Sequence, residues 1–290
     1  MTPRRTRIQA DFVLLFVSIV WGSAFAAQRV AAACMGVLLF NGFRYLLGGL
    51  VLLPLARARH LNRRTLGWAV LAGLLLSLAG GLQQAGLRHT TAGNAGFITG
   101  LYVVLVPLAL FVFWREKLGA GSWAAAGLAT AGLCLLSLSD EFRLRPGDGL
   151  ELAGAVFWAL HVITIGRAMR HADPVLFSIG QYLVAGVLSS AFGLGLEWQT
   201  LGGIRAAWWA IAYTGILSVG VGFTLQAAAQ RHAPPVDAAI ILSMESVFAA
   251  LFGWVFLSEW LTIRQLAGCG LILAAMLFAQ LRGSRDAGSP

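Results

Sequence analysis

The chain has 290 residues, of which 58% are hydrophobic and only 11% are charged, and its mean hydropathy is +0.78. Soluble domains carry about a quarter charged residues, so this composition excludes an ordinary soluble domain and indicates an integral membrane protein. The formal net charge of +9 comes almost entirely from arginines between long apolar runs, which is typical of topology control and speaks against nucleic-acid binding.

The segments predicted to cross the membrane follow each other along the whole chain. A helix needs about 20 mostly apolar residues to cross the hydrocarbon core. In chain order such segments lie at 11–31, 37–56, 66–86, 93–114, 120–138, 149–168, 175–195, 206–228, 235–257 and 264–282. The sequence therefore predicts an all-α integral membrane protein with ten transmembrane helices.

Several predicted helix starts carry typical capping residues. Asp11 and Asp148 stand where an N-cap is expected, and Glu151 has capping-box spacing to Asp148. Pro174 and Pro235 stand at helix entrances, where the missing N–H does no harm. We therefore interpret these acidic residues as structural.

The positive charges predict an orientation. With the N-terminus inside, fourteen Lys and Arg residues fall on cytoplasmic segments. Six fall on outer segments, namely Arg29, Arg88, Arg143, Arg145, Arg205 and Arg264. Cationic residues favour the cytoplasmic side. We therefore expect a multi-pass protein of a bacterial inner membrane with both termini in the cytoplasm.

The two halves of the chain resemble each other. In the matching segments Trp21 pairs with Trp158, Arg44 with Gln181, Gln83 with Gln226, Asn94 with Asp237, and Tyr102 with Glu245. Each half, 1–139 and 140–290, contains five predicted helices, and because five is odd the second half must enter the membrane from the opposite side. Inverted repeats are common in secondary transporters, which bind substrate near the membrane midplane between the repeats.

Three stretches carry a family resemblance. "SIVWGSAFAAQRVA" around Trp21, "GFITGLYVVLVPLALFVFWREKL" at 96–118 and "LSMESVFAALFGWVFLSEWLTIRQLAGCGLILAAML" at 242–277 resemble the EamA-type carriers of the drug/metabolite transporter superfamily. Among its members, the chain looks most like YddG-type exporters of aromatic and other neutral amino acids. The resemblance implies ten helices in two inverted halves and export of small metabolites or drugs. Family members often carry proline after the ninth-helix glutamate; Ser246 stands there instead, which puts a kink at this point in question.

Two charged residues lie within predicted helices. Charged groups at bilayer depth cost roughly 2.5–3.5 kcal/mol on insertion scales, so they usually face protein or water. Glu245 is a candidate to bind a substrate ammonium or carry a coupling proton, and Arg44 is a candidate to hold a carboxylate. The alternative for both is a purely structural role, satisfied by neighbouring polar groups or by each other.

Uncharged candidates complete the expected cavity. Trp21 and Trp158 sit deep in the first helix of each half, away from the interfaces where tryptophan is enriched. The remaining substrate-binding candidates are Gln83, Asn94, Tyr102, His161 and Gln226. Core packing remains an alternative for each. A cavity of aromatic and amide groups with few charges suits a small zwitterion or neutral amphiphile and suits phosphorylated sugars poorly.

Other classes of protein are disfavoured. The sequence has no nucleophile elbow, HExxH or P-loop, so we expect no enzyme, although an intramembrane one using Glu245 and His161 stays an alternative. A channel-like pore is a further alternative, but no repeated filter is present. Cys34, Cys134 and Cys269 lack metal-ligand spacing. We expect no cofactor and no metal, and a monomer or weak homodimer whose partners are lipid and a small-molecule substrate.

Overall fold

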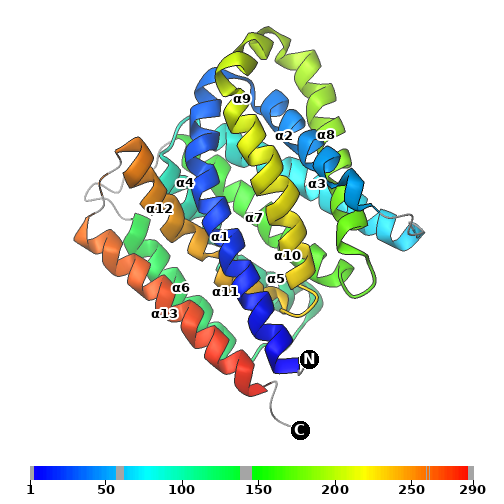
Figure 1. The fold of residues 1–290 in the computed structure, drawn as a ribbon. Coiled ribbons are helices and arrows are strands. Elements are labelled where there is room, and N and C mark those ends of the chain that lie inside the picture. Colours follow the sequence, from blue (N-terminus) through cyan, green and yellow to red (C-terminus); the bar gives the residue numbers. More distant parts are fainter. Residues whose placement is uncertain (1–2, 57–61, 138–145, 259, 261, 287–290) are drawn as a thin grey trace.

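Wherever the structure describes the chain, its regular structure is helical (Figure 1). The computed structural model describes residues 3–56, 62–137, 146–258, 260 and 262–286. Most elements are α-helices; η1 and η2 are short 3₁₀ segments and η3 is a π-helical segment. In chain order the elements are α1 (Pro3–Cys34), α2 (Val37–Leu52), η1 (Leu53–Leu55), α3 (Arg63–Gly86), α4 (Ala92–Gly100), α5 (Tyr102–Trp114), α6 (Ala120–Ser137), α7 (Pro146–Ala168), α8 (Pro174–Leu196), η2 (Trp198–Gly203), α9 (Ile204–Tyr213), η3 (Thr214–Phe223), α10 (Thr224–Ala229), α11 (Pro235–Leu242), α12 (Met244–Leu257) and α13 (Ile263–Asp286).

Eight helical stretches in the described residues are long and apolar enough to cross a membrane. They overlap eight of the ten predicted segments. The fifth and tenth predicted segments correspond to α6 and α13, whose apolar stretches, Ala120–Leu135 and Ile263–Ala279, are shorter. Helices are the expected solution because a backbone in lipid must satisfy its own hydrogen bonds. The prediction of an all-helical, multi-pass membrane protein is therefore confirmed.

Two predicted N-caps are wrong. Helix α1 begins at Pro3 and α7 at Pro146, so Asp11 and Asp148 lie inside helices. The polar residues before each apolar run continue the helix, and the Asp148 carboxylate bonds to side chains of a neighbouring segment instead. Asp173, in contrast, caps α8 by accepting hydrogen bonds from the backbone of Val175 and Leu176.

The fourth and ninth predicted helices are each broken in the middle. Helix α4 gives way to α5 at Leu101, and α11 gives way to α12 at Ser243. At both breaks the backbone makes an i to i+3 hydrogen bond, from Val104 N to Leu101 O at 3.0 Å and from Ser246 N to Ser243 O at 3.1 Å. Leu101 and Ser243 both keep right-handed helical angles, so the interruption before Glu245 is a single tight turn within one helical stretch, formed without a proline.

The two broken helices also end alike. Arg115 after α5 and Ser258 after α12 both adopt the left-handed conformation, with φ of 54° and 56°. These are the two non-glycine residues with positive φ in the described part of the chain. Arg115 and Ser258 are separated by the same number of positions as Gln83 and Gln226. The internal repeat of the sequence is therefore matched by the same backbone conformation at the same repeat position.

Tyrosines on α2 and α8 add a matched pair of side-chain contacts. The Tyr45 hydroxyl donates to the Leu76 carbonyl at 3.4 Å, and the Tyr182 hydroxyl donates to the Val219 carbonyl at 2.9 Å. Both tyrosines are fully buried. Each hydroxyl therefore ties the second helix of its half to the third.

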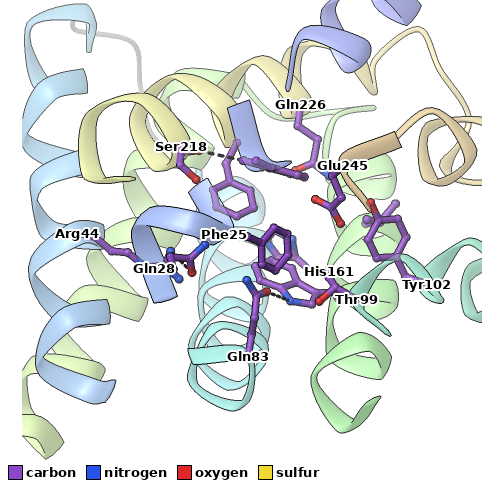
Figure 2. Close-up of a pocket in the computed structure, with 14 residues that line it drawn as sticks. Phe25, Gln28, Arg44, Gln83, Thr99, Tyr102, His161, Ser218, Gln226 and Glu245 are labelled. Atoms are coloured by element: carbon purple, nitrogen blue, oxygen red, sulfur yellow. Dashed lines mark hydrogen bonds between the residues drawn. The ribbon is translucent and has the colours of Figure 1, made fainter. Parts of the chain in front are cut away.

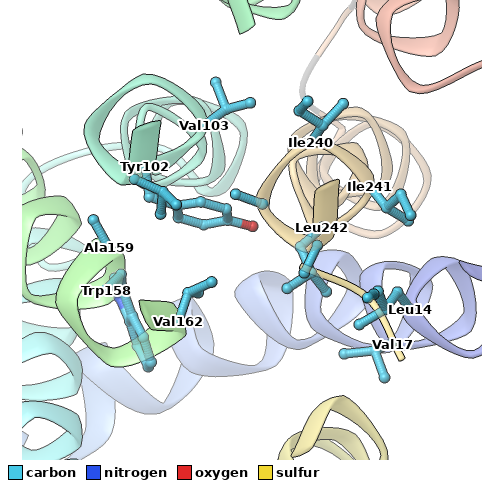
Figure 3. Packing of buried hydrophobic residues seen from close by; sticks show 14 of the residues in the cluster. Leu14, Val17, Tyr102, Val103, Trp158, Ala159, Val162, Ile240, Ile241 and Leu242 are labelled. Carbon is cyan, nitrogen blue, oxygen red and sulfur yellow. The ribbon is translucent and has the colours of Figure 1, made fainter. Parts of the chain in front are cut away.

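The buried centre is formed by α1, α5, α7 and α11. Figure 3 shows the Tyr102 ring pointing from α5 towards α11, where Ile240 and Leu242 lie, with Val162 of α7 on its other side. Large apolar side chains such as Phe113 and Leu196 are exposed on the outside, as expected for surfaces in contact with lipid. Helices α6 and α13 pack together along one side, and the start of α1 and the end of α13 lie at the same end of the bundle (Figure 1).

Candidate functional site

A pocket lies among side chains from both halves of the chain (Figure 2). Its lining residues come from α1, α2, α3, α4, α5, α7, η3, α10 and α12. They are Trp21, Phe25, Gln28, Arg44, Gln83, Thr99, Tyr102, Trp158, His161, Val162, Ser218, Phe223, Gln226 and Glu245. Eight of the nine candidates named from the sequence are therefore brought together in one place.

The ninth candidate, Asn94, does not line this pocket. Its side-chain amide donates to the Thr90 hydroxyl at 2.9 Å and to the Asp148 carboxylate at 2.7 Å. Asn94 sits in the first turn of α4, whereas Thr99 and Tyr102 face the pocket further along. At 3.6 residues per turn, Asn94 and Thr99 are about 140° apart around the helix, so they face different surroundings.

Aromatic rings form much of the wall. Phe223 lies between the two deep tryptophans, with centroid distances of 4.6 Å to Trp21 and 5.7 Å to Trp158. The Phe223 and Trp158 rings are nearly parallel, at 13°, while His161 meets Phe223 edge-on at 5.7 Å. Offset and edge-to-face arrangements of this kind are the favourable geometries for aromatic pairs. The wall is thus rigid and apolar.

The two indole N–H groups have different acceptors. Trp158 Nε1 donates to Gln83 Oε1 at 2.7 Å, which joins α7 to α3. Trp21 Nε1 donates to the backbone carbonyl of Ser218 at 3.1 Å, which joins α1 to η3. Both bonds hold the rings at fixed orientations against the pocket.

Arg44 is a buried cation with neutral partners. Its side chain, 3% exposed, donates to Gln28 Oε1 at 2.8 Å and to the Tyr45 hydroxyl at 3.1 Å. The guanidinium also lies 4.8 Å from the Tyr45 ring centroid and 5.3 Å from that of Phe40. It forms no ion pair within the described residues, so its charge remains available to an anionic group in the pocket.

Glu245 is a buried acid on the other side of the labelled residues from Arg44 (Figure 2). It is 3% exposed and its Oε1 has no hydrogen-bond partner in the described part of the protein. The Tyr102 hydroxyl points at the Glu245 carboxyl as a hydrogen-bond donor (Figure 2). Gln226 lines the same pocket and is fully buried, and both polar atoms of its amide are unpartnered in the described part of the protein. Polar groups without partners therefore gather at this end of the pocket.

His161 is held by a neighbour. Its Nε2 is 2.9 Å from Gln181 Oε1, and the ring is fully buried. Gln181 stands at the repeat position of Arg44. The second half thus has a neutral amide where the first half has a cation.

Six lining residues were missed from the sequence, and helical periodicity points to four of them. Phe25 and Gln28 follow Trp21 at the spacing of one helix face, Val162 is four residues after Trp158, and Thr99 is three before Tyr102. Ser218 and Phe223 lie in the π-helical segment, where ordinary helical spacing does not apply. Among the described residues, no group of three or more His, Cys, Asp or Glu is arranged to hold a metal ion.

A multi-pass helical bundle with a small amphipathic pocket among its central helices is the architecture expected of a membrane transporter of small metabolites. Comparison with known sequences agrees. The profile of the EamA-like transporter family matches residues 8–138 and again 145–280. The chain belongs to this family.

Individual relatives extend the comparison. An uncharacterised transporter of Archaeoglobus fulgidus is 31% identical over 95% of this chain and 87% of its own length. The threonine/homoserine exporter RhtA of Escherichia coli K12 is 30% identical, over 60% of this chain and 59% of its own length. A solved crystal structure superposes with a TM-score of 0.76, covering 97% of this chain and 99% of the other at 20% identity; this likeness concerns the fold.

Proposed function

We propose that the chain is a secondary transporter that exports neutral amino acids, aromatic ones among them, by alternating access around the central pocket. One observation carries the proposal. The aromatic-walled pocket contains one buried guanidinium, Arg44, and one buried carboxyl, Glu245, and neither is ion-paired within the described residues. A zwitterion brings the two opposite charges that these groups lack.

The remaining lining residues support the same substrate class. Gln28, Gln83, Thr99 and Gln226 offer neutral hydrogen-bonding groups, and the tryptophan and phenylalanine rings offer apolar surface for a side chain. Phosphorylated compounds would call for several inward basic groups, and Arg44 is the one Arg or Lys among the lining residues. A relative named as a threonine/homoserine exporter is consistent with amino acids as cargo.

We further propose ten crossings in two inverted halves, 1–139 and 140–290, with both termini in the cytoplasm of a bacterial inner membrane. Support comes from the breaks at Leu101 and Ser243, which lie within one position of repeat equivalence, from the equivalent helix ends at Arg115 and Ser258, and from the positive-charge bias. Impermeant labelling of cysteines introduced near residue 140 and near residue 4 tests this topology. Labelling of both from the same side contradicts it.

The transport proposal is tested by counterflow. Purified protein is placed in liposomes loaded with unlabelled phenylalanine or threonine, and uptake of the labelled amino acid is followed with and without a pH gradient. We expect saturable uptake that depends on the internal amino acid, and none in protein-free liposomes. Absence of counterflow for every neutral amino acid contradicts the proposal, and single-channel conductance would point to a pore.

A second candidate is export of small cationic amphiphiles. The observation that favours it is that the Glu245 carboxyl lines the same pocket as the Trp21 and Phe223 rings, since cations bind well to aromatic faces. Competition of an aromatic amine with amino-acid counterflow does not separate the two candidates, but transport of the amine without any amino-acid transport does.

A further inference from the structure

The repeat-equivalent glutamines Gln83 and Gln226 have unequal surroundings. Gln83 Oε1 accepts the indole N–H of Trp158 at 2.7 Å. Gln226 is fully buried, yet neither its Oε1 nor its Nε2 has a partner in the described part of the protein. The inverted repeat would provide Trp21, the counterpart of Trp158, as the donor to Gln226. That bond is not made.

The indole N–H of Trp21 binds the backbone of η3 instead of the Gln226 side chain. Its Nε1 donates to the Ser218 carbonyl, and this approach needs Gly222, because a Cβ there would lie 2.7 Å from Trp21 Nε1. The matching position of the first half is Ala79. The glycine therefore allows the second half to bind its tryptophan through the backbone rather than through the glutamine.

The helical geometry differs in the same place. Residues Thr214–Phe223 wind as a π-helix, whereas α3 is α-helical throughout Arg63–Gly86. π-Helical turns within helices are uncommon and are found frequently at functional sites. Here the π-helical segment carries both Ser218, which binds Trp21, and Phe223, which packs against it. The difference between the two halves at this point is therefore a difference in backbone conformation as well as in side-chain contacts.

The Gln226 amide, which Trp21 does not bind, shares this end of the pocket with a second polar group that lacks a hydrogen-bond partner, the Glu245 carboxyl. Glu245 Oε1 is also unpartnered, and Figure 2 shows the Gln226 and Glu245 side chains close together at the same end of the pocket. Burying an amide and a carboxyl oxygen without partners is unfavourable, so such groups in a folded protein call for an explanation. The Tyr102 hydroxyl can donate to one oxygen of the Glu245 carboxyl, which leaves the other oxygen and the whole Gln226 amide for a bound substrate to satisfy.

We propose that Gln226 and Glu245 form the subsite for the ammonium group of the substrate, an inference that rests on the proposed function and deepens it. The Glu245 carboxylate and Gln226 Oε1 are acceptors, and a primary ammonium offers three donors to them. The ring of Trp21, which lines the same pocket, offers a further favourable surface for a cation.

Binding of three related probes tests the subsite. Affinities for L-phenylalanine, 2-phenylethylamine and 3-phenylpropionate are measured on the purified full-length protein and on Gln226→Leu. We expect Gln226→Leu to weaken binding of phenylalanine and phenylethylamine about tenfold, the factor that one hydrogen bond to a charged group commonly provides. Binding of 3-phenylpropionate, which has no ammonium, should stay within about twofold on the same grounds.

Gln83→Leu is the matched control for stability. It removes the acceptor of Trp158 and should lower the melting temperature by several degrees, whereas Gln226→Leu replaces an unpartnered amide and should leave the melting temperature unchanged or raise it. A drop for Gln226→Leu as large as that for Gln83→Leu overturns the inference, as does equal weakening, or no weakening, of all three probes. If the unaltered protein binds none of the three, the amino-acid proposal itself fails.

Discussion

At the scale of single residues, Glu245 is the residue whose role, in transport or in helix packing, most needs to be decided. Its carboxyl is buried, forms no ion pair within the described residues and has an unpartnered oxygen. A group that only fixed helix packing would be expected to have its hydrogen bonds filled. The Tyr102 hydroxyl serves only one side of the carboxyl, so an oxygen that lines the pocket remains for a group that enters it.

The first prediction concerns Glu245→Gln. The change keeps the shape of the side chain and removes its charge, so the melting temperature should change little. Counterflow of a neutral amino acid should fall at least tenfold, since a hydrogen bond to a charged group contributes about 1.5–3 kcal/mol. The dependence of flux on pH should change as well. Flux that equals that of the unaltered protein at every pH would remove Glu245 from the mechanism. Glu116→Gln, at an exposed ion pair with Arg167, is the control.

Arg44 offers the complementary test. The second half carries Gln181 at the equivalent position, so Arg44→Gln replaces the cation by a group that the fold already accommodates there. We expect the protein to fold and the KM for zwitterionic substrates to rise by about ten- to a hundredfold, because a charge-assisted contact to the carboxylate is lost. Arg167→Gln, which alters an exposed pair, should leave KM unchanged. An unchanged KM in Arg44→Gln would assign Arg44 to packing.

At the scale of elements, the crossing of α4 and α12 depends on small residues. A Cβ added to Gly96 would lie 2.6 Å from the Ala249 Cβ, and the Ser246 hydroxyl donates to the Gly96 carbonyl at 2.6 Å. Small residues of this kind allow helix backbones to approach closely in membranes. The contact also gives Ser246 a role at the place where family members often carry proline.

Gly96→Ala is therefore predicted to destabilise the protein by about 1–3 kcal/mol, the usual cost of overpacking, and to lower its melting temperature in detergent. Gly81→Ala in α3 is the matched control, because a Cβ there meets nothing within 4 Å. That change should be neutral or stabilising by about 0.5–1 kcal/mol, since alanine favours the helix over glycine. Equal melting temperatures for the two variants would mean that the crossing is loose.

The same elements show what the sequence can and cannot predict. Apolar runs of membrane-spanning length locate the helices, and the internal repeat locates pocket residues such as Trp158 and Glu245 because matching positions reach matching depths. The breaks at Leu101 and Ser243 carry no proline at the point of interruption, so composition does not mark them. The π-helical segment carries no sequence signal either, and the close contacts that η3 makes with α1 and α2 are tertiary features that residue spacing does not reveal. Asn94 was misplaced because depth alone does not fix which way a helix face points.

At the scale of the whole molecule, two contacts join the first helix of one half to the broken helix of the other. Arg7 of α1 forms an ion pair with Asp237 of α11. Asp148 of α7 accepts hydrogen bonds from Thr90 at 2.9 Å and from Asn94 of α4 at 2.7 Å. Asn94 and Asp237 occupy equivalent repeat positions. In the proposed inverted topology the two contacts lie at opposite ends of the pocket, the former towards the cytoplasm.

Alternating access predicts that each contact restrains opening at its own side. Ser218→Cys, in a background without the three native cysteines, gives a thiol in the pocket wall that an impermeant reagent can reach only through an open end. Asp237→Asn should raise labelling from the cytoplasmic side about fivefold, the population change that corresponds to about 1 kcal/mol for a partly exposed ion pair. Asp148→Ala should raise labelling from the outer side instead. Because an opening at one side must close the other, each change should also lower labelling from the opposite side. If either variant increased labelling from both sides together, the pocket would be behaving as a leak rather than as the centre of a carrier.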